Sequence, residues 1–268
     1  MNISTIKQRV TVAIADVPST YFFMRKELRD LFLSLRAYLM ATFTFIGISF
    51  FMYIQTEIPF GTDPIVEMVI ALLSLLGLFY AVTFSMDSIV NEKTLRTMPL
   101  IRSAPVSASS IVLGKFSAIV ITWTGILTVS LLYFILGGRG LVGQVSWGNL
   151  ILGYASTILV VGAMSSAAIF ISSISSTVKS SALGSLGFLF GFMGLSVARQ
   201  LFASFESVMD ILDVFRNLSL IRYSSMITDE LFASGTEAIW GVAGLLAYIV
   251  VFMVAAIAIV GLREGDLP

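Results

Sequence analysis

Six long apolar runs, separated by shorter polar intervals, dominate the chain. They lie at about residues 37–54, 65–86, 116–136, 147–171, 181–197 and 239–262. A helix of about 20 apolar residues crosses a bilayer core of roughly 30 Å, so each run is long enough to span a membrane. The pattern predicts an all-α polytopic membrane protein, with a six-span domain over residues 37–268 and a more polar segment over residues 1–36.

The composition excludes most soluble and catalytic classes. Of the 268 residues, 57% are hydrophobic and 12% are charged, and the mean hydropathy is +0.96, whereas about a quarter of the residues in a soluble domain are charged. The chain has no Cys and no His, which removes disulfides, thiol catalysis and the commonest metal ligand and proton carrier. We therefore predict no catalytic residues, no metal site and no nucleic-acid partner.

The positive charges favour one orientation of the spans, because Lys and Arg are enriched in the cytoplasmic loops of membrane proteins. With both termini in the cytoplasm, the inner segments carry twelve such residues and the outer segments carry four. The inner ones are Lys7, Arg9, Arg25, Lys26, Arg29, Arg36, Lys93, Arg96, Arg102, Lys115, Lys179 and Arg263, and the outer ones are Arg139, Arg199, Arg216 and Arg222. This count predicts that both termini are cytoplasmic.

No ionisable group occupies the middle of a predicted span. Glu67 and Asp87 lie at opposite ends of the second span, and the only charge between Phe116 and Thr177 is Arg139, in an outer loop. Proton- and ion-coupled transporters keep such a group at mid-membrane despite a cost of a few kcal/mol. An ATP-independent secondary transporter or channel is therefore the less favoured alternative, and a membrane-embedded enzyme would lack a catalytic set.

Residues 19–35 precede the first span and have a helical periodicity of their own. Apolar side chains recur on one side of this helix, and charged side chains lie on the other. The apolar ones are Tyr21, Met24, Leu28, Leu31 and Leu35, and the charged ones are Arg25, Lys26, Arg29 and Asp30. The pattern predicts a helix that lies in the membrane interface. A charged flank that only anchors the first span is the alternative.

Residues 87–115 form the longest polar interval between two apolar runs. In order, the interval contains Asp87, Glu92, Thr94-Leu95, Leu100-Ile101, Pro105-Val106 and Ile111-Val112-Leu113-Gly114-Lys115. This order resembles the first cytoplasmic loop of ABC-2 type permeases, the membrane subunits of one class of ATP-driven exporters. Lys26-Glu27-Leu28, before the first span, resembles the elbow helix of that family, and the resemblance covers nearly the whole chain. One departure is Lys93, because the family often has Gly before the Thr.

The resemblance implies a permease that moves a substrate outward by alternating access, driven by a separate P-loop ATPase subunit. Residues 87–115 would contain the coupling helix that docks on the ATPase, and residues 172–181 a smaller contact. The implied coupling contacts are Glu92, Thr94, Leu95, Arg96, Met98, Leu100 and Ile101, with Glu92 as the main polar contact. The resemblance also implies a location in the plasma membrane of a prokaryote. The alternative is an ordinary loop whose charges only set the topology.

The chain has no recognisable nucleotide site of its own. Gly114-Lys115-Phe116 lacks both the upstream Gly and the following Ser or Thr of a phosphate-binding P-loop. We therefore expect that the chain is not an enzyme and carries no cofactor, and that ATP and Mg are bound by the partner ATPase.

The resemblance further implies a dimer of two copies, or of this chain and a related permease, with the second and fifth spans at the seam. On the fifth span, Gly184, Gly187, Gly191 and Gly194 share one helix face, and Gly187 and Gly191 form a G-x-x-x-G pair. On the second span, a shared face carries Leu76, Tyr80 and Phe84. These faces either line the seam and the translocation path or pack tightly within one chain, with the Tyr80 hydroxyl satisfied between helices.

The interval between the fifth and sixth spans, residues 198–237, is long for a loop. Apolar side chains recur in it at helical spacing, at Phe202, Phe205, Met209, Leu212 and Phe215. This predicts an amphipathic external segment, which the resemblance implies is a re-entrant helix that caps the exit; a loop that only packs over the spans is the alternative. Asn217-Leu218-Ser219 fits a glycosylation sequon, and residues 1–17 are predicted to be a cytoplasmic arm.

Overall fold

The computed structural model describes residues 19–57, 62–95, 107–137, 147–201 and 237–262, with residues 220, 222, 223, 226 and 227. Within these ranges the regular structure is helical throughout, and six helices are long and apolar enough to cross a membrane. The expected all-α, six-span class is therefore confirmed. The predicted arm (1–17), most of the external insert (198–237) and Asn217 lie outside the described residues.

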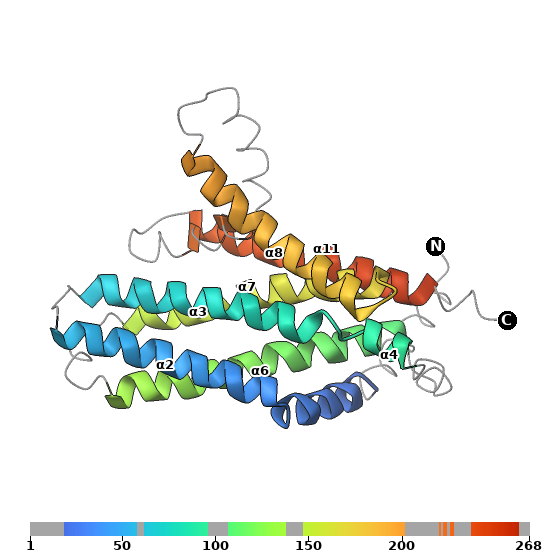
Figure 1. The fold of residues 1–268 in the computed structure, drawn as a ribbon, viewed down its shortest axis with the longest axis horizontal. Helices are drawn as coiled ribbons and strands as arrows, with labels where there is room; N and C mark the ends of the chain where they lie inside the picture. The colour runs from blue at the N-terminus through green and yellow to red at the C-terminus, as the bar shows by residue number, and fades with distance from the viewer. Residues whose placement is uncertain are drawn as a thin grey trace, which may run out of the picture.

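Each of the six long helices coincides with a predicted span (Figure 1). They are α2 (Leu35–Glu57), α3 (Thr62–Ser85), α6 (Ala108–Gly137), α7 (Trp147–Ile174), α8 (Val178–Leu201) and α11 (Glu237–Leu262). A short helix, α4 (Val90–Thr94), follows α3 after a turn. The helix α6 begins ahead of residue 116, where the third span was predicted to start, because the Ser107 hydroxyl accepts the Ser110 N–H (3.2 Å) and caps it.

The centre of the bundle is α7, which packs most extensively against α3 and α11 (Figure 1). Small residues make this close approach possible, since a helix rich in Gly, Ala and Ser lets its neighbours come near. Gly153 of α7 faces the Ile70 side chain of α3, and Gly77 of α3 faces Val161 of α7 and Trp123 of α6. Because α7 has no strongly polar face, it can lie in the interior of the protein.

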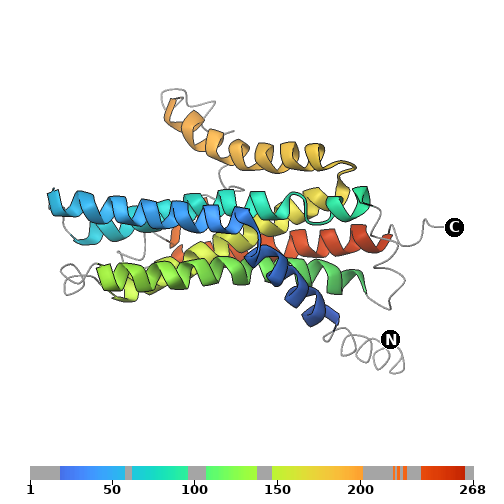
Figure 2. The same cartoon turned by 60° about the horizontal axis from the view of Figure 1, so that its bottom comes forward.

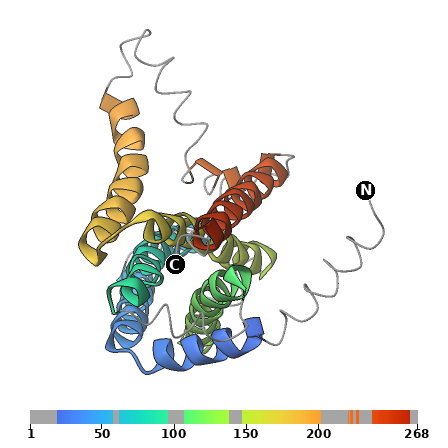
Figure 3. The same ribbon diagram turned by 90° about the vertical axis from the view of Figure 1, so that its right-hand side faces the viewer.

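Residues 19–32 form a further helix that runs obliquely to the spans at one end of the bundle (Figures 2 and 3). It ends just before Ser34, whose hydroxyl accepts the Ala37 N–H (3.3 Å) and caps α2. Several large apolar side chains of this region are exposed, among them Tyr21, Phe22, Phe32 and Leu33. That exposure fits the predicted position at a membrane surface, which stays a prediction.

Replacing Gly77 with Ala is expected to destabilise the bundle. A Cβ at Gly77 would lie 2.6 Å from Val161 Cγ2 and 3.0 Å from Trp123 Cζ2, and overpacking of this kind costs about 1–3 kcal/mol. Thermal unfolding of the detergent-purified protein should show a lower midpoint for Gly77→Ala. Gly125→Ala is the matched control, because its nearest neighbour would be Phe32 Cζ at 3.9 Å. Equal midpoints for the two variants would contradict this packing.

Candidate functional site

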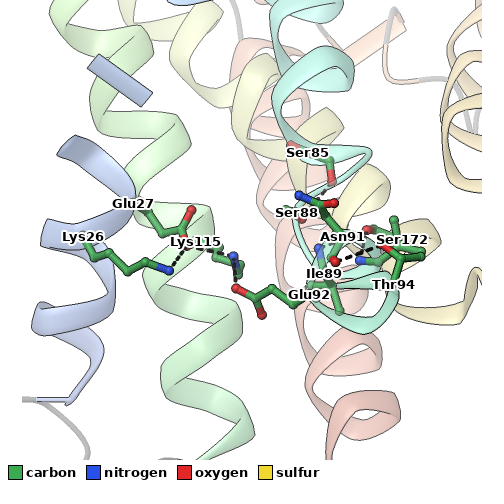
Figure 4. A network of polar contacts seen from close by, with 11 residues as sticks. Lys26, Glu27, Ser85, Ser88, Ile89, Asn91, Glu92, Thr94, Lys115 and Ser172 are labelled. Carbon is green, nitrogen blue, oxygen red and sulfur yellow. Dashed lines mark hydrogen bonds and ion pairs between the residues drawn. The ribbon is translucent and has the colours of Figure 1, made fainter. Parts of the chain in front are cut away.

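The candidate site is the segment 86–95, which comprises the turn after α3, the helix α4 and Leu95 (Figure 4). It lies at the end of the bundle where α6 begins and where the 19–32 helix crosses. A helix of five residues does not hold its shape through its own hydrogen bonds. Its position must therefore come from contacts with the surrounding helices.

A buried lysine joins three elements at this site. Lys115, on the second turn of α6, is only 4% exposed, and its Nζ donates to Glu27 Oε1 at 2.9 Å and lies 2.7 Å from Glu92 Oε1. Glu27 belongs to the 19–32 helix and Glu92 to α4 (Figure 4). A buried ammonium is tolerated only where carboxylates compensate it. The charge of Lys115 therefore holds both helices against α6.

The residue before Lys115 lets the 19–32 helix approach α6 closely. A Cβ at Gly114 would lie 2.7 Å from Phe23 Cβ and 3.2 Å from both Met24 N and Thr20 O. One turn earlier, the hydroxyls of Ser19 and Ser110 are 2.9 Å apart. Only glycine fits at position 114 without moving the neighbouring backbone, so Gly114 and Lys115 together set the distance between the two helices.

The start of α4 is capped by a side chain from a distant part of the chain. The Ser172 hydroxyl, near the end of α7, accepts the N–H groups of Ile89 (3.2 Å) and Val90 (3.1 Å). Neither N–H has a partner within a helix, so Ser172 satisfies donors that would otherwise be buried without one. This contact fixes α4 to the central helix of the bundle.

Lys93 strengthens the same contact from the other side. Its ammonium donates to the backbone carbonyls of Ser172, Ser173 and Ser175, where α7 ends. The last carbonyls of a helix carry partial negative charge and attract cations. The lysine that departs from the pattern of the resembled family thus has a structural role, which a glycine could not fill.

Two further contacts hold the turn before α4. Arg36, at the start of α2, pairs with Asp87 at 2.8 Å. Ser181, at the start of α8, donates a hydrogen bond to the Met86 carbonyl. The segment thus contacts α2, α6, α7 and α8 directly, and it is joined to the 19–32 helix through Lys115.

The predicted coupling residues separate into three groups. Glu92 is buried against Lys115, whereas Thr94 and Leu95 are exposed, Leu95 by 65%. Arg96, Met98, Leu100 and Ile101 lie outside the described residues. The contact of Glu92 and its neighbours with an ATPase stays a prediction. The described part offers Thr94 and Leu95 as its accessible surface.

The residues predicted for the dimer seam or the translocation path differ in how deeply they are buried. Tyr80 is buried, and its hydroxyl donates to the Ile119 carbonyl at 3.0 Å, while its ring lies against those of Phe84 and Trp123. This is the arrangement of a hydroxyl satisfied between helices. Phe84 is also buried, and Leu76 is half-buried.

The glycine face of α8 is largely uncovered by the residues that the structure describes. A Cβ at Gly187, Gly191 or Gly194 would meet nothing within 4 Å, and one at Gly184 would meet Ile171. Tight packing inside one chain therefore does not account for the last three glycines among the described residues. Towards its end, α8 also diverges from α7 and α11 (Figure 3).

Sequence reasoning did not find the pairing of Lys115 with Glu27 and Glu92. It treats Lys115 as a topology charge and Glu27 as part of the Lys26-Glu27-Leu28 pattern. The signal that could have found this contact is the position of Lys115 at the edge of a long apolar run, beside a glycine. No group of three or more acidic side chains in the described ranges is arranged to hold a metal ion.

Lys115→Met is expected to lower the free energy of unfolding by about 3–5 kcal/mol, since it removes the ammonium that Glu27 and Glu92 share while both carboxylates stay largely buried. Arg36→Gln is the matched control: its pair with Asp87 is exposed, so the loss should stay below about 1 kcal/mol. Denaturation in mixed micelles measures both, and the triple change Glu27→Gln, Lys115→Met and Glu92→Gln should regain much of the stability. A Lys115→Met protein as stable as Arg36→Gln would contradict the assigned role.

Ser172→Ala is expected to loosen α4 while the rest of the bundle stays intact. Loss of a cap costs about 1 kcal/mol, which corresponds to roughly fivefold faster exchange if opening is local. Hydrogen exchange of peptides covering residues 86–95 measures this. Ser175→Ala is the control, because its hydroxyl, just after the end of α7, donates to the Ile171 carbonyl (2.8 Å) and does not cap α4. Unchanged exchange in Ser172→Ala would show that the cap does not hold α4.

Comparison with known proteins agrees with this arrangement of helices. No curated protein sequence matches the chain. The sequence model of one family, described as ABC-2 family transporter protein, matches residues 5–264. The match includes all six spans, the 19–32 helix and the candidate site. The chain is a member of the ABC-2 family of transporter proteins and is a multi-pass membrane component of such a transporter.

Proposed function

We propose that the chain is the permease subunit of an ATP-driven exporter, and that α4 receives the movement of a separate P-loop ATPase. Family membership makes an ATPase partner the general expectation. The observation that carries the proposal is the way α4 is held: its inner side is fixed to α6, α7 and the 19–32 helix, and Thr94 and Leu95 remain exposed. A short helix built in this way suits the transfer of force from an external partner.

The path of the force follows from the contacts. Movement of α4 acts on α6 and the 19–32 helix through Glu92 and Lys115, and on α7 through Ser172 and Lys93. It acts on α3 directly, because only the turn 86–89 separates the two helices. The spans would then alternate between inward- and outward-open states, with the α4 end of the bundle in the cytoplasm. ATP and Mg are bound by the partner and not by this chain.

The uncovered glycines of α8 support a dimer. Gly187, Gly191 and Gly194 leave a smooth strip to which another helix can pack closely. A second copy, or a related permease, would cover this strip and place α3 and α8 along the translocation path. Two ATPase subunits would then act on the two copies of α4.

The alternative, transport without ATP, lacks a supporting observation. In the described parts of the six spans, the charged side chains lie near the helix ends, as Glu67 and Lys115 do, and Lys115 is neutralised by two carboxylates. A proton- or ion-coupled transporter needs such a group at mid-membrane. Movement of solute by the purified chain alone in liposomes, without an ATPase, would favour this alternative over the proposal.

Leu95→Asp tests the proposed docking surface. A carboxylate buried in an interface without a partner should weaken the complex with the ATPase by about tenfold or more, and ATP-dependent transport should fall with it. Leu95→Met is the matched control, because it keeps the apolar surface and should bind like the unmodified chain. The affinity is measured with both subunits in nanodiscs. Full affinity and full transport in Leu95→Asp would rule out α4 as the docking site.

A further inference from the structure

A cavity of about 600 Å³ lies between the 19–32 helix and the bundle, beside the candidate site. The 19–32 helix contributes one face to its wall, with Lys26, Asp30 and Leu31. Arg36 and Asp87 line it from α2 and from the turn after α3, and Phe84 lines it from α3. Charged side chains thus line the cavity from the 19–32 helix, from the turn and from the ends of α2 and α6, and the apolar side chains of Leu31 and Phe84 also line it.

The charges of the described residues that line the cavity do not cancel. Four carboxylates and three cationic side chains are among them. Lys115 lies between Glu27 and Glu92, Lys26 is 3.8 Å from Glu27, and Arg36 pairs with Asp87. Among the described residues, Asp30 is in no ion pair. A ligand that brings a cation to Asp30 would pair this carboxylate.

The same wall also offers donors to an anion. The side chains of Lys26 and Arg36 are 58% and 53% exposed, although each has a carboxylate nearby. An ammonium has three donors and a guanidinium has five, so both side chains keep donors for a further acceptor. Lys26 and Asp30 are four residues apart and therefore lie side by side on the helix. The cavity thus suits a ligand with a negative and a positive group a short distance apart.

The position of the cavity relative to the predicted membrane surface indicates which molecules can reach it. The helix that forms its wall exposes Tyr21, Phe22 and Phe32, and Leu33 directly after it is also exposed. Large apolar side chains flanking a charged helix face are typical of helices that lie in the headgroup region of a bilayer. The first membrane span, α2, begins at Leu35, directly after this helix. The predicted interfacial position of the 19–32 helix thus places phospholipid headgroups at the height of the cavity.

We propose that the cavity binds the headgroup of a zwitterionic aminophospholipid, with phosphatidylethanolamine as the best fit. The ammonium donates to Asp30, the phosphate accepts from Lys26 and Arg36, and the glycerol end lies towards Phe84 and Leu31. An anionic headgroup would add negative charge to a wall that already has an excess. A choline headgroup has no N–H with which to bond Asp30. The site requires neither nucleotide nor an ATPase, so it goes beyond the proposed function and can fail independently of it.

Lipid binding to the detergent-purified full chain tests the proposal, with dissociation constants measured by native mass spectrometry. The probes are phosphatidylethanolamine, phosphatidylcholine and phosphatidylglycerol with identical acyl chains. A charge-assisted hydrogen bond to Asp30 predicts about tenfold tighter binding of phosphatidylethanolamine than of phosphatidylcholine. In Asp30→Asn this preference should fall to about twofold or less, because the carboxylate charge is lost. In Lys26→Gln both lipids should bind more weakly.

Arg29→Gln is the matched control, because Arg29 is exposed on the same helix but does not line the cavity. It should bind all three lipids like the unmodified chain. Thermal unfolding without added lipid establishes that each variant is folded. If Asp30→Asn does not fold, Lys26→Gln still tests the site. An unmodified chain without preference for phosphatidylethanolamine, or a preference that survives Asp30→Asn, would overturn the proposal. If soluble glycerophosphoethanolamine displaced the lipid at an equal concentration, the ligand would be a soluble phosphoethanolamine and not a membrane lipid.

Discussion

The ammonium of Lys115, buried between two carboxylates, is the interaction on which the α4 end of the bundle depends. Charges at such short distances interact strongly where water is excluded, and separating them leaves an uncompensated buried charge. Glu27 and Glu92 come from helices that are otherwise separate, and both meet the same nitrogen. Neither the 19–32 helix nor α4 can leave α6 without breaking this arrangement. We therefore regard these three elements as one mechanical unit.

The unit is tied to the core of the protein by a different kind of contact. Ser172 caps the start of α4, and Lys93 binds the end of α7, the most central helix. The electrostatic link to α6 and the hydrogen-bonded link to α7 hold α4 from two sides. Its exposed edge at Thr94 and Leu95 is then the part that remains available to a partner. In the function that we propose, so firm a hold lets movement of α4 reach the spans.

The spans were predictable from the sequence because long apolar runs leave few alternatives to helices in a membrane. The end of the bundle was not, because its contacts join residues that are far apart in the chain: Lys115 and Glu27 are separated by 88 positions, and Lys93 and Ser173 by 80. The local sequence pattern indicates only that such charges orient the spans, and it does not show which of them form pairs. For Tyr80, the pattern favoured a satisfied hydroxyl over a substrate contact but could not name its partner, which is the Ile119 carbonyl. The α8 glycines are the opposite case, since their regular spacing already indicates a surface for another helix.

The most direct test of the mechanical unit is the distance between the 19–32 helix and α4 in the working complex. The chain has no Cys, so spin labels can be placed on Arg29→Cys and on Asn91→Cys, an exposed position of α4 outside the Thr94–Leu95 surface, without removing native thiols. Pulsed electron resonance then gives the distance distribution in the presence of the ATPase, with and without ATP. We predict a narrow distribution that is the same in both states, because Lys115 keeps the two helices together while they move relative to the other spans. A distance that changes or broadens when ATP binds would contradict the central claim.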